Sequence, residues 1–330
     1  MVNHLTIAFL LVISCPGMAK TRSEPIQPIE EFTFDASLAG KIELGKMLFF
    51  EPRLSSSGNI SCASCHNLGT GGVDNLAGSI GHGWHIGDTN APTVFNSRLN
   101  IAQFWDGRAK NLKEQAGGPI ANPKEMASSH QLAVRTLQSL PGYRIHFRKA
   151  YGDAAVTIDR ITDAIAMFEK TLMTPNSRFD RWLTGDDAAL TASEKAGYDL
   201  FKSKGCIGCH NGPGVGGGSY QKFGIVKPWR LQRALGRYNV TKSDSDKYVF
   251  KVPMLRNVEL TAPYFHDGSV WTLEEAVAVM AEFQLGMKLN AFEVSNIVAF
   301  LKSLTGEQPK VTQPILPPRA AKTPIPNLSH

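Results

Sequence analysis

The pentapeptide Cys-x-x-Cys-His occurs twice in this chain of 330 residues, as C-A-S-C-H at 62–66 and as C-I-G-C-H at 206–210. This pattern is the attachment signature of c-type haem, in which both thiols bond to the porphyrin and the adjacent histidine binds the iron. The two motifs therefore predict two covalently bound haem c groups. The predicted attachment residues are Cys62, Cys65 and His66 for the first haem, and Cys206, Cys209 and His210 for the second.

Two other kinds of site use paired cysteines. Structural zinc requires two Cys pairs about fifteen to twenty residues apart, whereas these pairs are 144 residues apart. A thioredoxin-like dithiol explains neither the histidine that follows each pair nor the duplication. Haem attachment is therefore the preferred interpretation.

The duplication extends to the segments before the motifs. Residues 38–50 and 190–201 each have helical periodicity, a central glycine and a Leu-Phe pair near the end. Thr191 and Glu194 form a capping-box pattern at the start of the second segment. We therefore predict a mainly α fold of two tandem cytochrome c-like haem domains, with long loops and little strand.

Composition supports two globular domains, because 42% of the residues are hydrophobic and 19% are charged. We predict a signal peptide at 1–19, an N-terminal haem domain at 20–186 and a C-terminal haem domain at 187–305. Residues 306–330 contain six prolines and no helical period. They are predicted to be extended and packed on the surface, or disordered.

The N-terminus indicates export. A short apolar block, Leu5 to Ser14, precedes small residues and predicts a secretory signal peptide cut after Ala19. The block is too short to span a bilayer, and no longer apolar run follows, so no transmembrane segment is expected. We predict a soluble periplasmic protein. A lipoprotein cleavage that leaves Cys15 acylated at a membrane surface is the weaker alternative.

Function depends on the sixth ligand of each iron, because the porphyrin and the proximal histidine occupy five positions. For the first haem, His82 and His85 lie in a glycine-rich loop that could fold over the ring. The glycines on either side of His82 permit a close backbone approach. The residues alone leave both histidines open.

For the second haem, the downstream candidates are Met254, Met280 and Met287, with His266 as a further possibility. Met280 falls on the apolar face of a predicted helix that begins after Thr272. Taken alone, that position fits a core methionine. A His/Met pair would raise the reduction potential of the second iron relative to the first.

The chain resembles a known family, the bacterial di-haem cytochrome c peroxidases. The resemblance runs from about Leu38 to Gln308. It is carried by I-G-H-G-W, N-A-P-T-V-F-N, Q-F-W-D-G-R-A-K, E-Q-A-G-G-P-I, N-P-K-E-M and V-P-M-L-R-N-V-E-L-T-A-P-Y-F-H-D-G.

The resemblance implies a role for several residues. His82 resembles the displaceable ligand of the peroxidatic haem, in the N-terminal domain, and Met280 the axial ligand of the electron-transferring haem. Trp105 resembles the tryptophan between the haems. Gln115 and Glu125 resemble the distal pair that handles peroxide.

The resemblance also implies calcium between the domains. Its ligands resemble Asn90 and the carbonyl groups of Thr261 and Pro263. Hard oxygen donors of this kind suit calcium.

The implied function is reduction of hydrogen peroxide to water. Electrons from a small periplasmic cytochrome c or copper protein would enter at the His/Met haem and pass to the peroxidatic haem. The family commonly forms homodimers, and the modest net charge of +6 gives no reason to expect a nucleic acid partner.

Two rival functions remain. The first is a two-haem electron carrier that performs no chemistry, against which the resemblance of Glu125, Gln115 and the His82 loop argues. The second is the related group of di-haem enzymes that oxidise residues of a partner protein. Those enzymes place a tyrosine where Met280 stands, so Met280 favours the peroxidase.

Overall fold

The structure is a computed structural model that describes residues 21–229 and 234–328. The predicted signal peptide at 1–19, with Cys15, lies outside these residues. Helices dominate the described chain, and its one sheet has two strands, which confirms the mainly α fold with little strand. Among the described helices, none is both long enough and apolar enough to cross a membrane.

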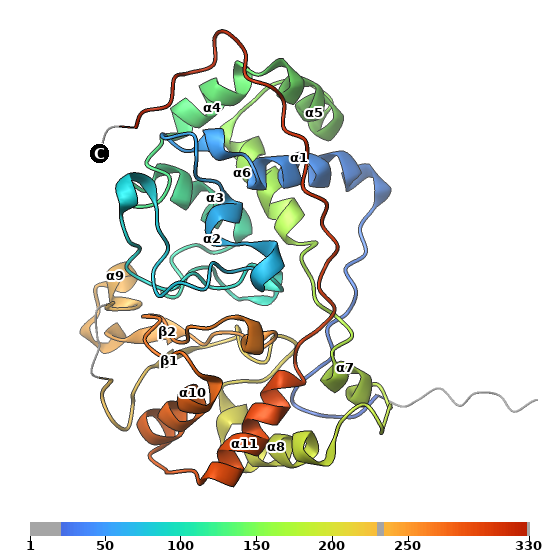
Figure 1. Cartoon of the computed structure of the whole chain (residues 1–330), viewed down its shortest axis with the longest axis vertical. Helices are drawn as coiled ribbons and strands as arrows, with labels where there is room; N and C mark the ends of the chain where they lie inside the picture. Colours follow the sequence, from blue (N-terminus) through green and yellow to red (C-terminus); the bar gives the residue numbers. More distant parts are fainter. Residues whose placement is uncertain (1–20, 230–233, 329–330) are drawn as a thin grey trace, which may run out of the picture.

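The earlier part of the chain forms the upper half of the molecule in Figure 1. Its helices are α1 (Ala39–Phe49), α2 (Cys62–Cys65), α3 (Leu112–Ala121), α4 (His130–Gln138), α5 (Pro141–Tyr151) and α6 (Ile158–Glu169). Thr157 caps the N-terminus of α6, and the apolar face of that helix packs against α1, α3 and α4. These contacts build a core that includes Leu44, Tyr143 and Phe147.

The later part of the chain forms the lower half and has its own core. Its elements are α7 (Arg178–Leu183), α8 (Ala192–Ser203), β1 (Tyr220–Lys222), α9 (Tyr238–Thr241), β2 (Val249–Lys251), α10 (Leu273–Val279) and α11 (Ala291–Lys302). The strands pair antiparallel, with Tyr220 opposite Lys251. Phe179, Tyr198 and Phe300 pack edge to face or tilted, with ring centroids 4.8–5.1 Å apart.

Each half is built around one close helix crossing. A Cβ added to Gly45 of α1 would lie 1.9 Å from the carbonyl oxygen of Ala164 in α6. A Cβ added to Gly197 of α8 would lie 1.8 Å from the carbonyl oxygen of Asn296 in α11. Only glycine permits so close an approach. The glycine shared by the two duplicated segments is therefore the crossing point of the same helix pair in both halves.

The repeat continues beyond the haem motifs at a constant spacing of 161 residues. Asn96 and Asn257 both adopt positive φ, 59° and 62°, and so do Phe104 and Phe265, 66° and 69°. Each phenylalanine lies in a loop closed by an antiparallel bridge, Gln103 with Ala109 and Tyr264 with Val270. The two halves therefore share a backbone path well past the attachment sites.

Two reciprocal backbone hydrogen bonds lie at the contact between the halves. The backbone N–H of Asn90 donates to the carbonyl oxygen of His266 over 2.9 Å. The backbone N–H of Lys251 donates to the carbonyl oxygen of Trp105 over 2.8 Å. Lys251 follows Asn90 by 161 residues, and His266 follows Trp105 by the same number. The repeat thus relates the two bonds, as expected for an internal two-fold arrangement.

The end segments cross between the halves, as Figure 1 shows. At the start of the described chain, the N–H of Arg22 donates to the carbonyl of Leu183, and Ile26 lies in the core of the later half. Beyond α11, residues 307–328 run back over the earlier half. There Leu316 packs on the core, and the N–H of Asn327 donates to the carbonyl of Ser56. The division at residues 186 and 187 stays a prediction, and α7, which precedes it, packs in the later core.

Candidate active site

The first Cys-x-x-Cys-His motif begins at helix α2, and Ser61 and Ser64 form a capping box at its N-terminus. Cys62 and Cys65 are therefore one helical turn apart on the same side of α2. Burial raises the pKa of the Cys62 thiol and raises that of Cys65 to about 11, so both are neutral thiols. His66 follows them, with Nδ1 3.4 Å from the carbonyl oxygen of Gly72.

The second motif repeats this arrangement. Nδ1 of His210 lies 3.3 Å from the carbonyl oxygen of Val215. Burial lowers the pKa of His210 to about 4, which keeps the ring neutral, and raises the pKa of the Cys206 thiol to about 11. A backbone carbonyl on Nδ1 fixes the ring and leaves Nε2 free to bind a metal ion. His66 and His210 are thus both prepared as ligands.

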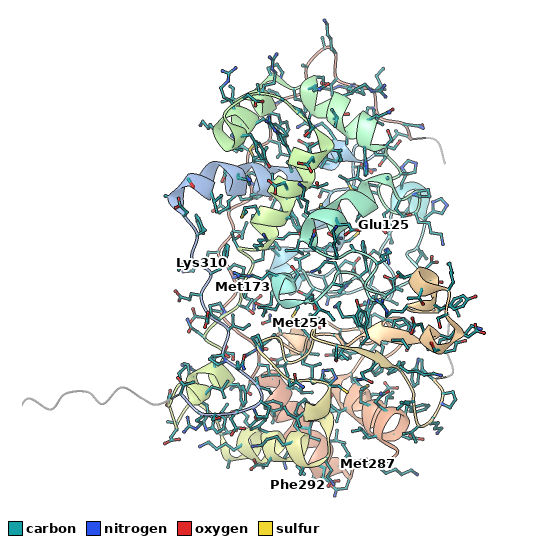
Figure 2. The ribbon with its side chains drawn as sticks, turned by 180° about the vertical axis from the view of Figure 1, so that it is seen from behind. Glu125, Met173, Met254, Met287, Phe292 and Lys310 are labelled. Atoms are coloured by element: carbon teal, nitrogen blue, oxygen red, sulfur yellow. The ribbon has the colours of Figure 1, made fainter. Side chains whose placement is uncertain are left out.

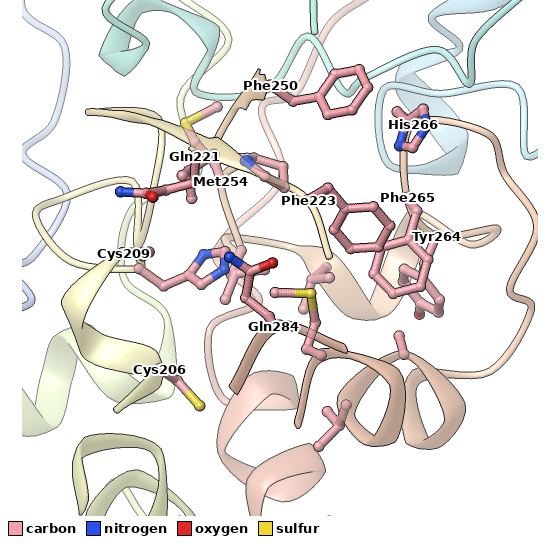
Figure 3. Close-up of a pocket in the computed structure, with 18 of the residues that line it drawn as sticks. Cys206, Cys209, Gln221, Phe223, Phe250, Met254, Tyr264, Phe265, His266 and Gln284 are labelled. Carbon is pink, nitrogen blue, oxygen red and sulfur yellow. The ribbon is translucent and has the colours of Figure 1, made fainter. Parts of the chain in front are cut away.

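The second motif opens onto a cavity of about 240 Å³ (Figure 3). Its walls include Cys206, Cys209 and His210, together with all four downstream candidates for the sixth position, Met254, Met280, Met287 and His266. The cavity therefore brings the candidates together without selecting one. α10 ends at Val279, and Met280 begins a π-helical turn that extends to Gln284. Turns of this kind are frequent at functional sites.

The cavity extends to the earlier half of the molecule, where Trp105 lines it. The indole N–H of Trp105 donates to the carbonyl oxygen of Asn90 over 2.8 Å, which fixes the ring. Its ring centroid lies 6.3 Å from that of His266, at an interplanar angle of 71°. Trp105 therefore lies at the contact between the halves.

The three predicted calcium ligands line the same cavity: Asn90, Thr261 and Pro263. Asn90 is 7% exposed, and its amide nitrogen donates to the carbonyl of Leu76. The amide nitrogen of Asn75 donates to the carbonyl oxygens of Leu260 and Ala262, which alternate along the chain with those of Thr261 and Pro263. The three predicted residues therefore line one cavity, and each carries oxygen atoms of the kind that a hard cation prefers.

His82 and Glu125 meet on the earlier half. Ile80 and Ile86 close a tight loop around His82, whose backbone N–H donates to the carbonyl oxygen of Glu125 over 2.7 Å. A Cβ on Gly81 would lie 1.9 Å from the carbonyl oxygen of Lys124, so the loop packs directly on this segment. The predicted displaceable ligand and the predicted distal acid are thus backbone neighbours.

The remaining distal residues differ in their surroundings. Burial raises the pKa of Glu125, and the amide of Asn122 donates to its Oε1 over 2.6 Å. Gln115 is half-buried on α3. His85 is exposed, with Nδ1 2.7 Å from the carbonyl oxygen of His82. Figure 2 places Glu125 in the upper half, well above Met254 and Met287.

Sequence reasoning missed several buried ionisable residues, among them Lys251 and Glu169. Lys251 lines the cavity and is 7% exposed, although lysine is normally a solvated residue. Glu169 is 4% exposed at the end of α6. A signal for Glu169 existed, because it follows Ile165 by four residues and so falls on the apolar face of its helix.

The residues present fit haem at both motifs. Each motif offers two thiols and a histidine whose Nδ1 faces a backbone carbonyl. At the second motif they open onto a cavity that is large and mainly apolar. In that cavity Nε2 of His266 is buried and has no hydrogen-bond partner among residues 21–229 and 234–328. A polar group of a bound ligand would satisfy such an atom.

Comparisons with known proteins agree with two haems in one chain. The profile of the family described as di-haem cytochrome c peroxidase matches residues 39–188. The chain is 60% identical over 303 residues to the cytochrome c551 peroxidase of Nitrosomonas europaea, covering 92% of this chain and 90% of that protein. It is 53% identical over 290 residues to the cytochrome c551 peroxidase of Pseudomonas aeruginosa, covering 86% of this chain and 84% of that protein.

The fold is also found among solved structures. A MauG-like protein associated with microbial copper homeostasis superposes with a TM-score of 0.72 at 27% sequence identity, covering 91% of this chain and 96% of that one. The identities and their coverage confirm the resemblance carried by the sequence motifs. The chain belongs to the di-haem cytochrome c peroxidase family.

Proposed function

We propose that this protein is a periplasmic enzyme that reduces hydrogen peroxide to water with electrons from a small cytochrome c or copper protein. The main support is one arrangement of residues. The cavity at the second haem motif extends to Trp105 at the contact between the halves, and the His82 loop packs on Glu125 beyond that contact. An entry site for electrons and a site for peroxide would then lie on either side of one tryptophan.

Two haems, attached covalently through the cysteines of the two motifs, would supply the redox chemistry. In this proposal residues 20–186 form the peroxidatic domain and residues 187–305 form the electron-transfer domain. His66 and His210 would each hold one iron. Met280 would also hold the second iron, permanently, and His82 would hold the first iron reversibly. The described part of the proline-rich tail, 306–328, lines no part of the cavity at the second motif.

The protein would handle the protons of the reaction through Glu125. With His82 withdrawn, Gln115 would orient the peroxide. The carboxylate of Glu125 would accept the proton of the near oxygen and return it to the far oxygen, which then leaves as water. Two electrons from the donor protein and two protons from solvent would convert the near oxygen into the second water. Burial raises the pKa of Glu125, and a raised pKa suits a carboxyl that must both take and give a proton near neutral pH.

Trp105 would couple the two sites. Its indole is fixed by the hydrogen bond to the carbonyl of Asn90, and its ring faces His266 of the other half. An aromatic ring in this place shortens the gap that an electron must cross. Calcium at Asn90, Thr261 and Pro263 would stiffen the same contact, and a homodimer is the expected assembly.

The test is peroxide turnover with reduced cytochrome c, comparing wild-type protein with Glu125→Gln. We expect both haem spectra to persist and turnover to fall by about 10²–10⁴-fold, the usual contribution of a general acid-base group. Because the carboxylate must be ionised to accept a proton, wild-type activity should fall as pH drops through the raised pKa of Glu125. Glu114→Gln, an exposed change on α3, is the matched control.

Two results would count against the proposal. If Glu125→Gln reduced peroxide at the wild-type rate, Glu125 would have no part in the mechanism. A wild-type protein that exchanges electrons with a reduced donor but consumes no peroxide would be an electron carrier, the other function that two haems permit.

A further inference from the structure

We propose that Lys251 and His266 form a carboxylate-binding subsite that holds the propionates of the haem attached at Cys206 and Cys209. Both side chains line the cavity at the second motif, together with Trp105 and Asn90 of the other half. The subsite therefore lies where the cavity meets the contact between the halves. The inference rests on the proposed haem at this motif and goes beyond the peroxidase reaction.

Lys251 is a buried cation that lacks a counter-ion. Its Nζ lies 3.0 Å from Oδ1 of Asn100, a neutral partner, and an ammonium group has two more donors to satisfy. No carboxylate lies within 4.0 Å of this Nζ in the part of the chain that the structure describes. Burial alone lowers the pKa of Lys251 to about 8. A charge buried in this way normally has an anionic partner, and the cavity that Lys251 lines offers space for one.

His266 supplies the second donor. It is 4% exposed, and its Nε2 is buried without a hydrogen-bond partner among residues 21–229 and 234–328. The ring stacks on Phe250 with centroids 4.1 Å apart at 22°, and it contacts Phe223 edge to face with centroids 5.7 Å apart (Figure 3). These contacts fix the ring plane while leaving Nε2 unsatisfied. A ring fixed in this way is arranged to donate to a ligand.

The internal repeat shows that these donors are specific to the second site. Lys251 and His266 stand where the earlier half has Asn90 and Trp105, 161 residues before them. The later half therefore has a lysine and a histidine where the earlier half has an asparagine and a tryptophan, neither of which carries a charge. A positive charge near an iron favours the reduced state, because reduction lowers the charge of the iron by one. The subsite would thus raise the reduction potential of the second haem.

The test is the reduction potential of each haem, measured by spectroelectrochemical titration of the mature protein. We expect Lys251→Met to shift the reduction equilibrium of the second haem at least tenfold toward the oxidised form, which is about 59 mV for one electron. The first haem should shift by less. Lys251→Arg, which keeps the charge, should restore most of the difference. Lys222→Met is the matched control, because Lys222 lines the same cavity but is exposed and screened by water.

Equal potentials for Lys251→Met and Lys222→Met would overturn the subsite, and so would equal shifts at both haems. If Lys251→Met does not mature, His266→Phe carries the same test, because it keeps the ring contacts and loses the donor. An unchanged second potential in His266→Phe would then overturn the proposal. Peroxide turnover, measured alongside, separates the two proposals: a potential shift in a protein that consumes no peroxide supports the subsite and refutes the enzyme.

Discussion

Glu169 has a carboxyl group whose burial is not offset by any partner. It is 4% exposed at the end of α6, and its Oε2 has no hydrogen bond among the described residues. Burial raises the pKa of Glu169 from the ordinary value of 4.5 to about 8. The folded protein therefore holds a proton that the unfolded chain loses above pH 4.5. Stability from this source is complete below pH 4.5 and is lost as pH rises toward 8.

The size of the effect follows from these two values. The interval from pH 5 to pH 8 corresponds to about 4 kcal/mol in the free energy of unfolding, at 1.36 kcal/mol per pH unit. Glu169→Gln removes the ionisation while retaining the shape. The free energy of unfolding of the wild type, relative to this variant, should therefore decline by about 4 kcal/mol across that interval.

The assay is guanidinium unfolding followed by far-ultraviolet circular dichroism at pH 5, 6, 7 and 8, with both haems attached. Glu31→Gln is the matched control, because Glu31 is exposed and should show no such trend. A difference between wild type and Glu169→Gln that stays constant with pH would refute the reasoning. It would mean that water or a cation reaches this carboxyl in the folded protein.

Three further perturbations test other parts of the structure. Gly197→Ala should destabilise the later half by about 1–3 kcal/mol through overpacking at the helix crossing. The control is Gly117→Ala, where an added Cβ would lie 3.6 Å from the nearest atom, and it should be neutral or slightly stabilising. Equal unfolding midpoints for the two variants would contradict the crossing geometry. Trp105→Ala should retain both haems and slow the arrival of electrons at the first haem, measured by stopped-flow spectroscopy, and unchanged rates would remove Trp105 from the path. A calcium chelator should lower turnover reversibly, and full activity in calcium-free protein would exclude the proposed ion.

The features that the sequence predicted are local ones. Thr191 caps α8 and exchanges hydrogen bonds with Glu194, as the capping-box pattern indicates. Thr272 likewise caps α10. Such contacts span three residues and depend only on side-chain type and spacing, so one sequence is enough to find them.

The features that the sequence did not predict depend on distant partners. The continuous helix expected through Met280 becomes a π-helical turn after Val279, and no residue type marks that change. The burial of Lys251 could not be predicted either, because its hydrogen-bond partners, Asn100 and the carbonyl of Trp105, come from the other half of the chain. The proline-rich tail has no periodic pattern, so its place along the earlier half could not be found from spacing.

That tail has a consequence for the order in which contacts form. Residues 311 to 327 lie over the earlier half, with Val311 against the core that also contacts Cys62, and they come last in the chain. The buried residues of the earlier cores come from positions 44 to 172. The tail is therefore added over a core that the preceding residues already supply.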